Sequence, residues 1–295
     1  MKVFICGDHK VLTSPCVIIM NHRTRFDWLF LWCFLMRRGC LSYEKIILKE
    51  GIKRVPLYGW GTQCAGFLFL SRSWTNDEQL ITRGLNYYMK SSYPLQLLLF
   101  PEGTDLSPSN KAKSQQFAKE RQLQVYNNVL HPRTKGFIKC IKELTKNDYL
   151  QSVIDITVAY NGDMPQNESD LAAGRWPNEV HFNVKMFPIS ELPIHDEHQL
   201  EQWIQDRWQR KEDLLADFYQ NGKFTDKYTH LPGDHCRLHL TGVLVFWCVM
   251  NMLLFYLMAT SWLFWLLLAT GTVIFLTMSR RYGGIEQLEL LRFYR

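Results

Sequence analysis

The sequence lacks the short patterns that mark several common kinds of site. Its eight cysteines are scattered and none forms a C-x-x-C pair. We therefore expect neither a zinc ribbon nor a disulfide scaffold, and we expect a reducing compartment. No G-x-S-x-G sequence occurs, which argues against a thioesterase or serine hydrolase built on a nucleophile elbow. The first ten residues, MKVFICGDHK, are too short and too polar for the apolar core of a secretory signal.

Charge is absent from one long part of the chain. Between Leu240 and Met278 there is no charged residue over 39 positions. A single helix of that length would measure roughly 58 Å, against about 30 Å for the hydrocarbon core of a bilayer. We predict two short spans that turn near residues 260–261, with one span and an interfacial extension as the alternative, and we disfavour a soluble core helix. Basic residues flank the run on both sides, which fits a hairpin with both ends in the cytosol.

The composition allows one large domain or two smaller ones, since 295 residues can bury a sizeable core. The net charge of +6 suits anionic lipid surfaces or phosphorylated substrates, although many proteins with neither partner have the same balance. Aromatic residues make up 14% of the chain, and interfacial membrane proteins often favour them. We expect no nucleic-acid partner.

Residues 1–190 alternate between short apolar runs and longer amphipathic stretches, which predicts βαβ units and a mostly parallel sheet. The run LQLLLF is unbroken, as in a strand that is buried on both faces. We therefore predict an α/β fold, with a mostly parallel or mixed sheet flanked by helices and a C-terminal transmembrane helical hairpin. The predicted strands are 17–20, 45–48, 67–70, 95–100, 155–160 and 180–187, and the predicted helices are 26–38, 76–91, 134–144 and 199–219.

Polar stretches indicate how these elements are connected. Residues 105–115 are predicted to form a surface loop, and residues 220–236 a linker. The helix over 199–219 carries Trp203 and Trp208 among many charges, so it either lies on the membrane surface or packs on the sheet. The expected domains are an α/β domain over 1–195, an amphipathic helix and linker over 196–236, the hairpin over 237–280 and a short tail over 281–295.

The sequence NHRTRFD follows the apolar run CVIIM. In a βα unit His22 would lie at the carboxyl end of a strand and Asp27 at the start of the next helix, at the edge where open α/β sheets bind ligands. Five residues of chain allow the carboxylate to accept the Nδ1–H of the imidazole, which leaves Nε2 as a proton acceptor. The alternative is that Asp27 only starts a helix and His22 only fills a loop, and the spacing alone does not decide.

Two further strand exits carry polar residues. In FPEGTD, Pro101 ends a strand, Gly103 permits a tight turn, and Glu102 at the tip could hydrogen-bond a substrate hydroxyl or a partner side chain. In GFLFLSR, Arg72 would be a bidentate phosphate binder at the same edge. Taken alone, the first motif is better explained as a plain turn and the second as a surface arginine.

Together, the motifs resemble those of the glycerophospholipid acyltransferases, which acylate lysophosphatidic acid and related lysophospholipids from acyl-CoA. NHRTRFD matches the N-H-x4-D block of that family, VPLYGWG its loop block, GFLFLSR its G-x-x-F-[IL]-x-R block, FPEGTD its F-P-E-G-T block, and DITVAY its last apolar block. The five blocks occur in order over roughly residues 1–190, which makes chance a poor explanation. NHRTRFDW, FPEGTDL and HPRTKGF are most similar to the lysocardiolipin and lysophosphatidylinositol acyltransferase branch.

This resemblance implies a fold, an activity and a site. It implies a glycerolipid acyltransferase-like domain over 1–195 that moves an acyl group from acyl-CoA to a free hydroxyl of a lysophospholipid at a lipid bilayer. It implies no metal and no cofactor other than acyl-CoA as co-substrate. The catalytic residues would be His22 and Asp27, and the substrate-binding residues would be Asn21, Arg72, Glu102, Gly103, Thr104 and Arg133.

The sequence departs from the family pattern in two places. Many members read F-P-E-G-T-R, with an arginine implicated in phosphate binding, whereas this chain has Asp105 there. Contacts to the acceptor would then rest on Arg72 and on Arg133 or Lys135, which argues against lysophosphatidic acid as the main acceptor. Members of this branch also carry an apolar segment before the first block, so we expect a shortened isoform or an incomplete gene model.

Several alternatives stay open at this stage. The acceptor could still be 1-acylglycerol-3-phosphate, that is, lysophosphatidic acid, and a non-catalytic lipid-binding membrane protein is the alternative from another class. The family implies the endoplasmic reticulum, and the lysocardiolipin branch allows a mitochondria-associated membrane, with the catalytic domain in the cytosol. The sequence does not fix the acceptor head group, the acyl chain, the sn position or the oligomeric state.

Overall fold

A computed structural model describes residues 1–8, 15–55, 58–71, 73–226, 228–230 and 234–287. The chain divides into two compact units. The first unit joins Met1–Lys49 to Leu68–Leu231, and the second joins Glu50–Phe67 to Pro232–Arg295. The second unit therefore takes a short segment from the middle of the first, in addition to the whole C-terminal part of the chain.

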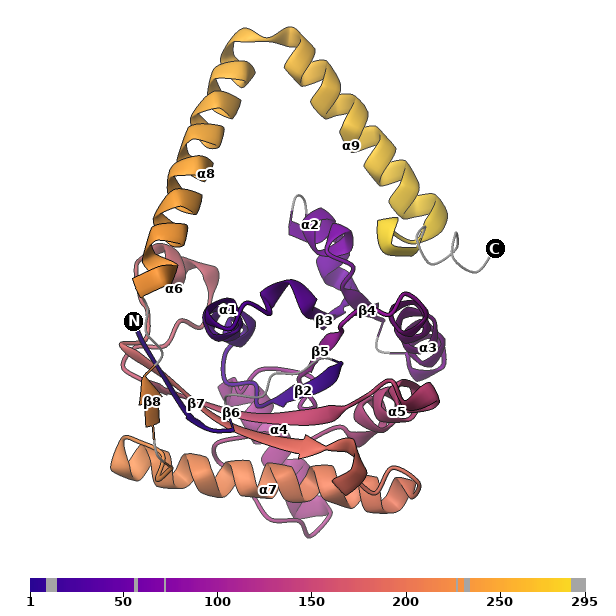
Figure 1. Ribbon diagram of the computed structural model, residues 1–295, viewed down its shortest axis with the longest axis vertical. Coiled ribbons are helices and arrows are strands. Elements are labelled where there is room, and N and C mark those ends of the chain that lie inside the picture. Colours follow the sequence, from indigo (N-terminus) through magenta and orange to yellow (C-terminus); the bar gives the residue numbers. More distant parts are fainter. Residues whose placement is uncertain (9–14, 56–57, 72, 227, 231–233, 288–295) are drawn as a thin grey trace. The chain divides into compact units, whose positions relative to one another are not determined.

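The first unit is built on one mixed sheet (Figure 1). Among the described residues its eight strands pair in the order β4-β3-β5-β2-β6-β7-β1-β8. The five strands from β4 to β6 are parallel, β7 is antiparallel to β6 and parallel to β1, and β8 is antiparallel to β1. The predicted α/β class and mixed sheet are confirmed. The strands are β1 Lys2–Gly7, β2 Cys16–Met20, β3 Glu44–Lys49, β4 Leu68–Leu70, β5 Gln96–Leu99, β6 Ser152–Asn161, β7 Glu179–Pro188 and β8 Tyr228–His230.

Helices cover both faces of this sheet. On one face α1 buries an apolar stripe, within which Phe34 stacks on Phe182 of β7 at 5.8 Å between ring centroids. On the other face α3, α5 and α7 share a core with alternate side chains of β2, β5 and β6. Burial on both faces explains the unbroken apolar run of β5. The helices of this unit are α1 Asp27–Arg37, α3 Trp74–Lys90, α4 Pro108–Glu120, α5 Thr134–Leu144, α6 Glu168–Ala172 and α7 Glu197–Asn221, with 3-10 turns at Leu41–Tyr43, Lys146–Asp148 and Ile189–Glu191.

The strands predicted from the sequence correspond to β2 to β7, and the predicted helices to α1, α3, α5 and α7. Two connections were predicted wrongly. Residues 105–115 are not all loop, because Pro108 occupies the first turn of α4 and the side chain of Ser107 accepts the N–H of Asn110 as its N-cap. The linker over 220–236 contains β8, which pairs with β1. The helix with two tryptophans packs on the sheet, which settles the alternative left open above.

The second unit contains two long apolar helices, α8 Asp234–Thr260 and α9 Trp262–Tyr282. The stretches Thr241–Thr260 and Trp262–Tyr282 are each long and apolar enough to cross a membrane, and neither is buried. Ser261 separates them and caps α9 by accepting the N–H of Phe264 at 3.2 Å. The predicted division into two helices near residues 260–261 is confirmed.

The short segment of the second unit forms the 3-10 turn Glu50–Arg54 and the helix α2 Tyr58–Cys64. It contacts the end of α9 and the residues that follow. The Trp60 ring lies 4.6 Å from that of Phe275, Lys53 forms an ion pair with Glu286, and the N–H of Ile285 donates to Gln63 at 3.1 Å. Segments more than 200 positions apart in the sequence therefore form this unit.

Candidate active site

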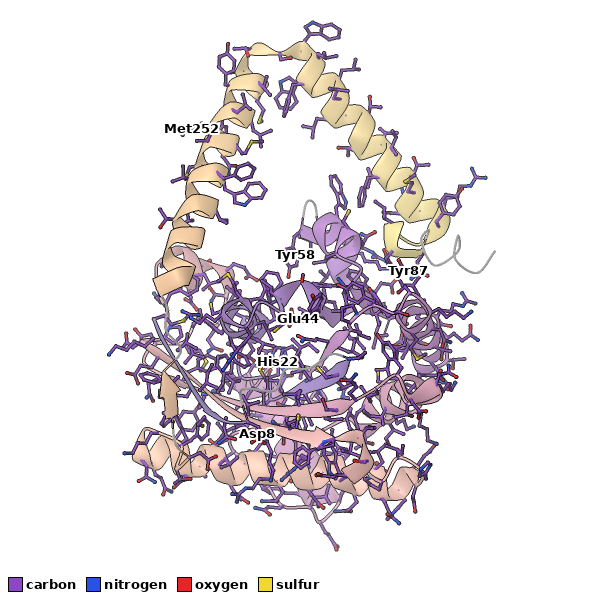
Figure 2. The ribbon with its side chains drawn as sticks, in the orientation of Figure 1. Asp8, His22, Glu44, Tyr58, Tyr87 and Met252 are labelled. Carbon is purple, nitrogen blue, oxygen red and sulfur yellow. The ribbon has the colours of Figure 1, made fainter. Side chains whose placement is uncertain are left out.

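Three neighbouring strands of the first unit end at the same edge of the sheet. β2 lies between β5 and β6 and runs parallel to both. His22 follows β2 by two residues, Glu102 follows β5 by three, and Tyr160 is the residue before the last of β6. Figure 2 labels His22 close to β2. Parallel strands place ligand sites at their carboxyl ends, so this edge is the natural position for a site.

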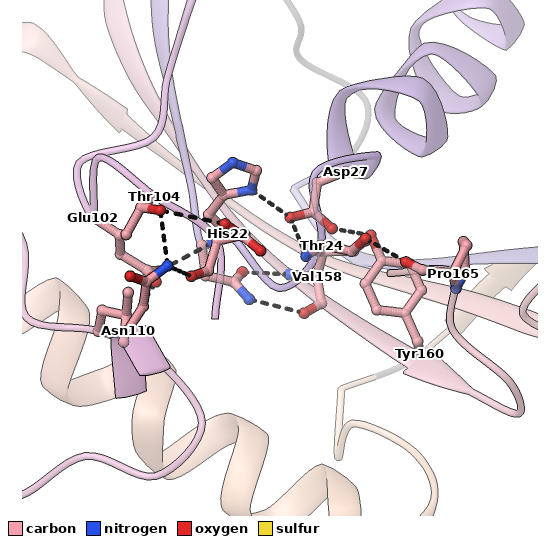
Figure 3. A network of polar contacts seen from close by, with 12 residues as sticks. His22, Thr24, Asp27, Glu102, Thr104, Asn110, Val158, Tyr160 and Pro165 are labelled. Carbon is pink, nitrogen blue, oxygen red and sulfur yellow. Dashed lines mark hydrogen bonds and ion pairs between the residues drawn. The ribbon is translucent and has the colours of Figure 1, made fainter. Parts of the chain in front are cut away.

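The loop between β2 and α1 folds back so that the side chains of His22 and Asp27 meet (Figure 3). The Nδ1–H of His22 donates to Oδ2 of Asp27 at 2.8 Å. The same carboxylate oxygen accepts the N–H of Thr24 at 3.0 Å. Asp27 is fully buried and the His22 side chain is 16% exposed. The pair thus has a fixed geometry, with one edge of the imidazole toward the protein and the other available.

The second oxygen of Asp27 also has a partner. Tyr160, which is buried at the end of β6, donates its hydroxyl to Oδ1. The loop is tied to β6 and to the segment beyond it as well. Asn21 pairs with the backbone of Val158 through both its amide nitrogen (3.1 Å) and its amide oxygen (2.8 Å), and the hydroxyl of Thr24 donates to the carbonyl of Pro165 at 2.6 Å. Both polar groups of Asn21 are thus engaged with the sheet.

Glu102 is buried beneath His22, with 2% of its surface exposed. Its Oε1 accepts the backbone N–H of His22 at 3.1 Å and the indole N–H of Trp208 at 3.2 Å, and its Oε2 accepts the N–H of Leu130 at 3.0 Å. The ring of Phe100, two residues earlier, stacks on the imidazole of His22 at 4.2 Å. The turn after β5 therefore supports both the backbone and the ring of His22.

The rest of this turn is held by its own contacts. Gly103 has φ +73°, a conformation in which glycine is favoured, and an added Cβ would lie 3.3 Å from Cδ of Arg133. Arg133 is exposed, and its N–H donates to the carbonyl of Pro101 at 2.7 Å. Thr104 donates to Asp105 and accepts from the Asn110 amide. An exposed arginine side chain therefore lies beside the glycine of the turn.

The surroundings shift the pKa values of the two central groups. Burial opposes the charged imidazolium, but the hydrogen bond and charge of Asp27, together with the charges of Glu102 and Asp105, raise the pKa of His22 above its ordinary value. Burial raises the pKa of Glu102 to about 7, against the opposing effect of its three N–H donors and of His22. His22 is therefore a stronger base than a free histidine.

The structure brings most of the predicted site residues together. The residues that lie around the exits of β2 and β5 are His22, Asp27, Glu102, Gly103, Thr104 and Arg133. Asn21 directly follows β2, and its side chain bonds the backbone of β6. Arg72 lies outside the described residues. The residue before it, Ser71, is held by its N–H and hydroxyl to Oδ1 of Asp77, at 2.7 and 2.8 Å. In the described part of the chain, no group of three or more His, Cys, Asp or Glu side chains is placed to hold a metal ion.

Sequence reasoning missed three residues of this neighbourhood. Tyr160 ends the apolar block DITVAY, and a tyrosine at the exit of a buried strand was the available signal. Trp208 and Lys211 lie three positions apart on α7, and Lys211 forms a buried ion pair with Asp155 of β6. The available signal for the Lys211–Asp155 pair was a lysine three positions after a tryptophan, on the side of α7 that faces the sheet.

Two family profiles match the chain. The profile described as Acyltransferase covers residues 2–161, and the one described as Acyltransferase C-terminus covers residues 170–247. The chain belongs to the acyltransferase family. The first match contains the exits of β2, β5 and β6, and the second contains α7 with Trp208.

Relatives in this family extend over nearly the whole chain. Lysocardiolipin acyltransferase 1 from Mus musculus is 42% identical over 301 positions, and the protein of the same name from Gallus gallus is 40% identical over 299. Each alignment covers 98% of this chain and 78% of the relative. Lysophosphatidylinositol acyltransferase 10 from Caenorhabditis elegans is 33% identical over 314 positions, covering 99% of this chain and 78% of the relative. The resemblance to this branch, inferred above from three sequence blocks, is confirmed.

Proposed function

We propose that this acyltransferase moves a fatty acyl group from acyl-CoA to a free hydroxyl of a lysophospholipid, with lysocardiolipin or lysophosphatidylinositol as the expected class of acceptor. The observation that carries the proposal is the pair of His22 and Asp27. The carboxylate holds Nδ1–H, so Nε2 is the atom that can take a proton, and Figure 3 shows it on the side of the ring away from Asp27. The names of the relatives support the class of acceptor.

The proposed reaction is a direct transfer. Nε2 of His22 takes the proton of the acceptor hydroxyl while the oxygen forms a bond to the thioester carbonyl carbon. The tetrahedral intermediate then breaks its carbon–sulfur bond, and the CoA thiolate takes the proton back from His22 and leaves as a thiol. Asp27 keeps the imidazole in the productive tautomer and stabilises its positive charge between the two steps.

Arg133 is proposed as a contact for the phosphate of the acceptor. It is exposed, it lies beside Gly103, and the turn that carries Gly103 also carries the support of His22. A guanidinium can bind two phosphate oxygens at once. Arg72 is proposed for the same role from the sequence alone. Asp105 at the end of the turn replaces a phosphate-binding arginine, and this supports a larger acceptor over lysophosphatidic acid.

The two apolar helices of the second unit are proposed to cross the bilayer as a hairpin. Their length, their apolar surface and the basic residues at both ends support this. We propose the endoplasmic reticulum or a mitochondria-associated membrane as the location, with the first unit in the cytosol, where acyl-CoA would reach it.

The test is a transfer assay on the purified full-length protein. Labelled acyl-CoA is supplied with a panel of lysolipids that includes lysocardiolipin, lysophosphatidylinositol and lysophosphatidic acid. The proposal expects the label in the phospholipid. A hydrolase would place the label only in free fatty acid, and a lipid-binding scaffold would leave it in acyl-CoA. His22→Ala should lower transfer by about 10²–10⁴-fold, while His195→Ala, an exposed control in the turn just before α7, should not. Near-normal transfer by the His22 variant would refute the mechanism.

A further inference from the structure

Glu102 directs its side chain to the protein. Both of its oxygens accept N–H groups, from His22, Trp208 and Leu130, and only 2% of the residue is exposed. A carboxylate with three such donors has little capacity left for a substrate hydroxyl. Its direct effect is on the backbone of His22, whose N–H it holds at 3.1 Å.

Trp208 completes this arrangement from α7. Its side chain is fully buried, and within the described residues its indole N–H has Glu102 as hydrogen-bond acceptor, at 3.2 Å. A buried indole N–H needs an acceptor, and a charged acceptor makes the stronger bond. The helix that carries Trp208 is fixed on the sheet by its apolar stripe, which includes Leu200, Ile204 and Leu215. Trp208 therefore connects a rigid helix to the carboxylate beneath His22.

Lys211 lies on the same face of α7, one helical turn later. It is 1% exposed, its ammonium group donates to the carbonyl of Ile156 at 2.6 Å, and it forms an ion pair with Asp155. Its Nζ lies 5.2 Å from the centroid of the Trp208 ring. Its positive charge also interacts with Glu102. The face of α7 that meets Glu102 thus supplies one hydrogen-bond donor and one buried positive charge.

We propose that Trp208 is a positioning residue for acyl transfer, which acts on His22 through Glu102. The inference rests on the proposed function above and deepens it. Trp208 fixes Glu102, Glu102 fixes the N–H of His22, and Phe100 on the same turn carries the imidazole ring. A small displacement of this turn would move Nε2 away from the position where it meets the acceptor hydroxyl, and such displacements lower rates strongly.

We call the connection from Trp208 through Glu102 to His22 the relay. The charged and titratable groups around Glu102 determine how the relay responds to pH. His22 faces it from the exit of β2 and Lys211 from α7, with Asp155 and Arg207 behind Lys211. Asp105 on its own turn faces His22. The pKa of Glu102 is raised by burial to about 7, and the indole N–H of Trp208 is one of the groups that lower it. Loss of that N–H should therefore raise this pKa further, so that Glu102 becomes protonated at a higher pH.

The first experiment compares Trp208→Phe with the matched control Trp203→Phe in the full-length protein, in lipid nanodiscs. Trp203 lies on the same helix, where it stacks on Phe137 and meets Phe187 edge to face rather than contacting Glu102. With the acceptor on which the wild type is most active, Trp208→Phe should lower kcat on the order of tenfold. It should leave KM nearly unchanged. It should also move the acidic limb of the pH profile to higher pH, because Glu102 becomes protonated at a higher pH and then no longer holds His22 as the carboxylate does. An unmoved pH profile, or the same shift in the control, overturns the inference.

The second experiment repeats the substitution in a Glu102→Gln background. The amide does not titrate in this range, so Trp208→Phe should produce no further shift of the pH profile there. An equal shift in both backgrounds would mean that Trp208 acts by another route, and it would overturn the relay.

A spectroscopic readout separates this inference from the proposed function. In protein labelled with 5-fluorotryptophan, the resonance of Trp208, assigned from its loss in Trp208→Phe, should titrate near pH 7 in the wild type and should not do so in Glu102→Gln. This result supports the relay even if no acyl transfer is found, in which case the proposed function alone fails. A resonance that is identical in the wild type and in Glu102→Gln overturns the relay whatever the activity.

Discussion

The phenol of Tyr160 donates a hydrogen bond to Oδ1 of Asp27, the oxygen that the histidine does not use. Both side chains are buried, and burial together with the nearby charge of Asp27 raises the pKa of Tyr160 well above its ordinary value, so the phenol remains a donor. The carboxylate is therefore fixed at both oxygens. This explains how Asp27, the first residue of α1, can hold an imidazole in one orientation.

Tyr160→Phe should lower kcat by about tenfold, because it removes a hydrogen bond to a charged group worth about 1.5–3 kcal/mol. Asp27 would then place more of its negative charge on His22, so the acidic limb of the pH profile should move to higher pH. The measurement is kcat/KM against pH. Tyr149→Phe is the control, since that hydroxyl donates to the carbonyl of Tyr93. Wild-type kinetics in the Tyr160 variant would show that the two bonds at Oδ2, from His22 and Thr24, are enough to hold Asp27.

Asp27→Asn should lower transfer on the order of 10²–10⁴-fold. The amide can present its N–H₂ group to Nδ1 and so favour the wrong tautomer, and it carries no charge to stabilise the imidazolium. The residual activity should keep an acidic limb at lower pH than in the wild type, because the pKa of His22 loses its main support. Steady-state kinetics across pH measure both effects. Residual activity with an unmoved limb would argue that Asp27 does not govern the proton on His22.

The wild type should gain activity as pH rises through neutrality. His22 can accept a proton only when it is neutral, and its pKa is raised above the ordinary 6.5. The neutral fraction therefore grows with pH, and the midpoint of the acidic limb of kcat/KM should lie above 6.5. A midpoint clearly below that value would mean that burial outweighs the effect of Asp27. An acceptor whose phosphate is a diester, and so does not titrate near neutral pH, distinguishes this limb from titration of the lipid phosphate.

Arg133→Ala should raise KM for the lysophospholipid by about tenfold and change kcat little, because a charge-assisted contact to phosphate would be lost. Titration of the acceptor at saturating acyl-CoA measures this. Arg121→Ala is the matched control, an exposed arginine that lies over the ring of Phe117 instead. An unchanged KM in Arg133→Ala would leave the acceptor phosphate to other residues.

Lys211→Met should destabilise the first unit by about 3–5 kcal/mol, because it leaves Asp155 buried without its main partner. Adding Asp155→Asn to this variant should recover part of the loss, since the uncompensated charge is removed. Thermal unfolding in detergent, with both variants measured at one lipid concentration, gives the comparison. The Asp155→Asn single variant completes the comparison. If the stability that the double variant loses relative to the wild type equals the sum of the losses of the two single variants, the two residues are not coupled.

The sequence contains most of what determines the sheet and the central pair. The exits of β2 and β5 were predicted because apolar runs of strand length are followed at once by polar residues and turn formers. That local pattern also placed His22, Asp27 and Glu102 on one edge, since neighbouring parallel strands end together. These inferences needed only residues within a few positions of one another.

Hydrogen-bond partners that are far apart in the sequence could not be predicted from such local patterns. Tyr160 meets Asp27 across 133 positions and Trp208 meets Glu102 across 106. β1 was missed because a six-residue strand at the very start of the chain has no flanking helix to mark it, and it exists through its pairing with β7 and β8. The start of α4 was hidden in a stretch rich in Ser, Pro and Asn, where capping residues resemble loop residues.

The way the second unit is assembled bears on attempts to produce a water-soluble fragment. The segment Glu50–Phe67 connects β3 to β4, which pair with each other in the sheet, and its partners are in the C-terminal part of the chain. Truncation after residue 231 would remove those partners, and with them the contacts that Lys53, Trp60 and Gln63 make to the C-terminal part of the chain. A crystallisable version would therefore need two edits, a C-terminal deletion and a short designed bridge from Lys49 to Leu68.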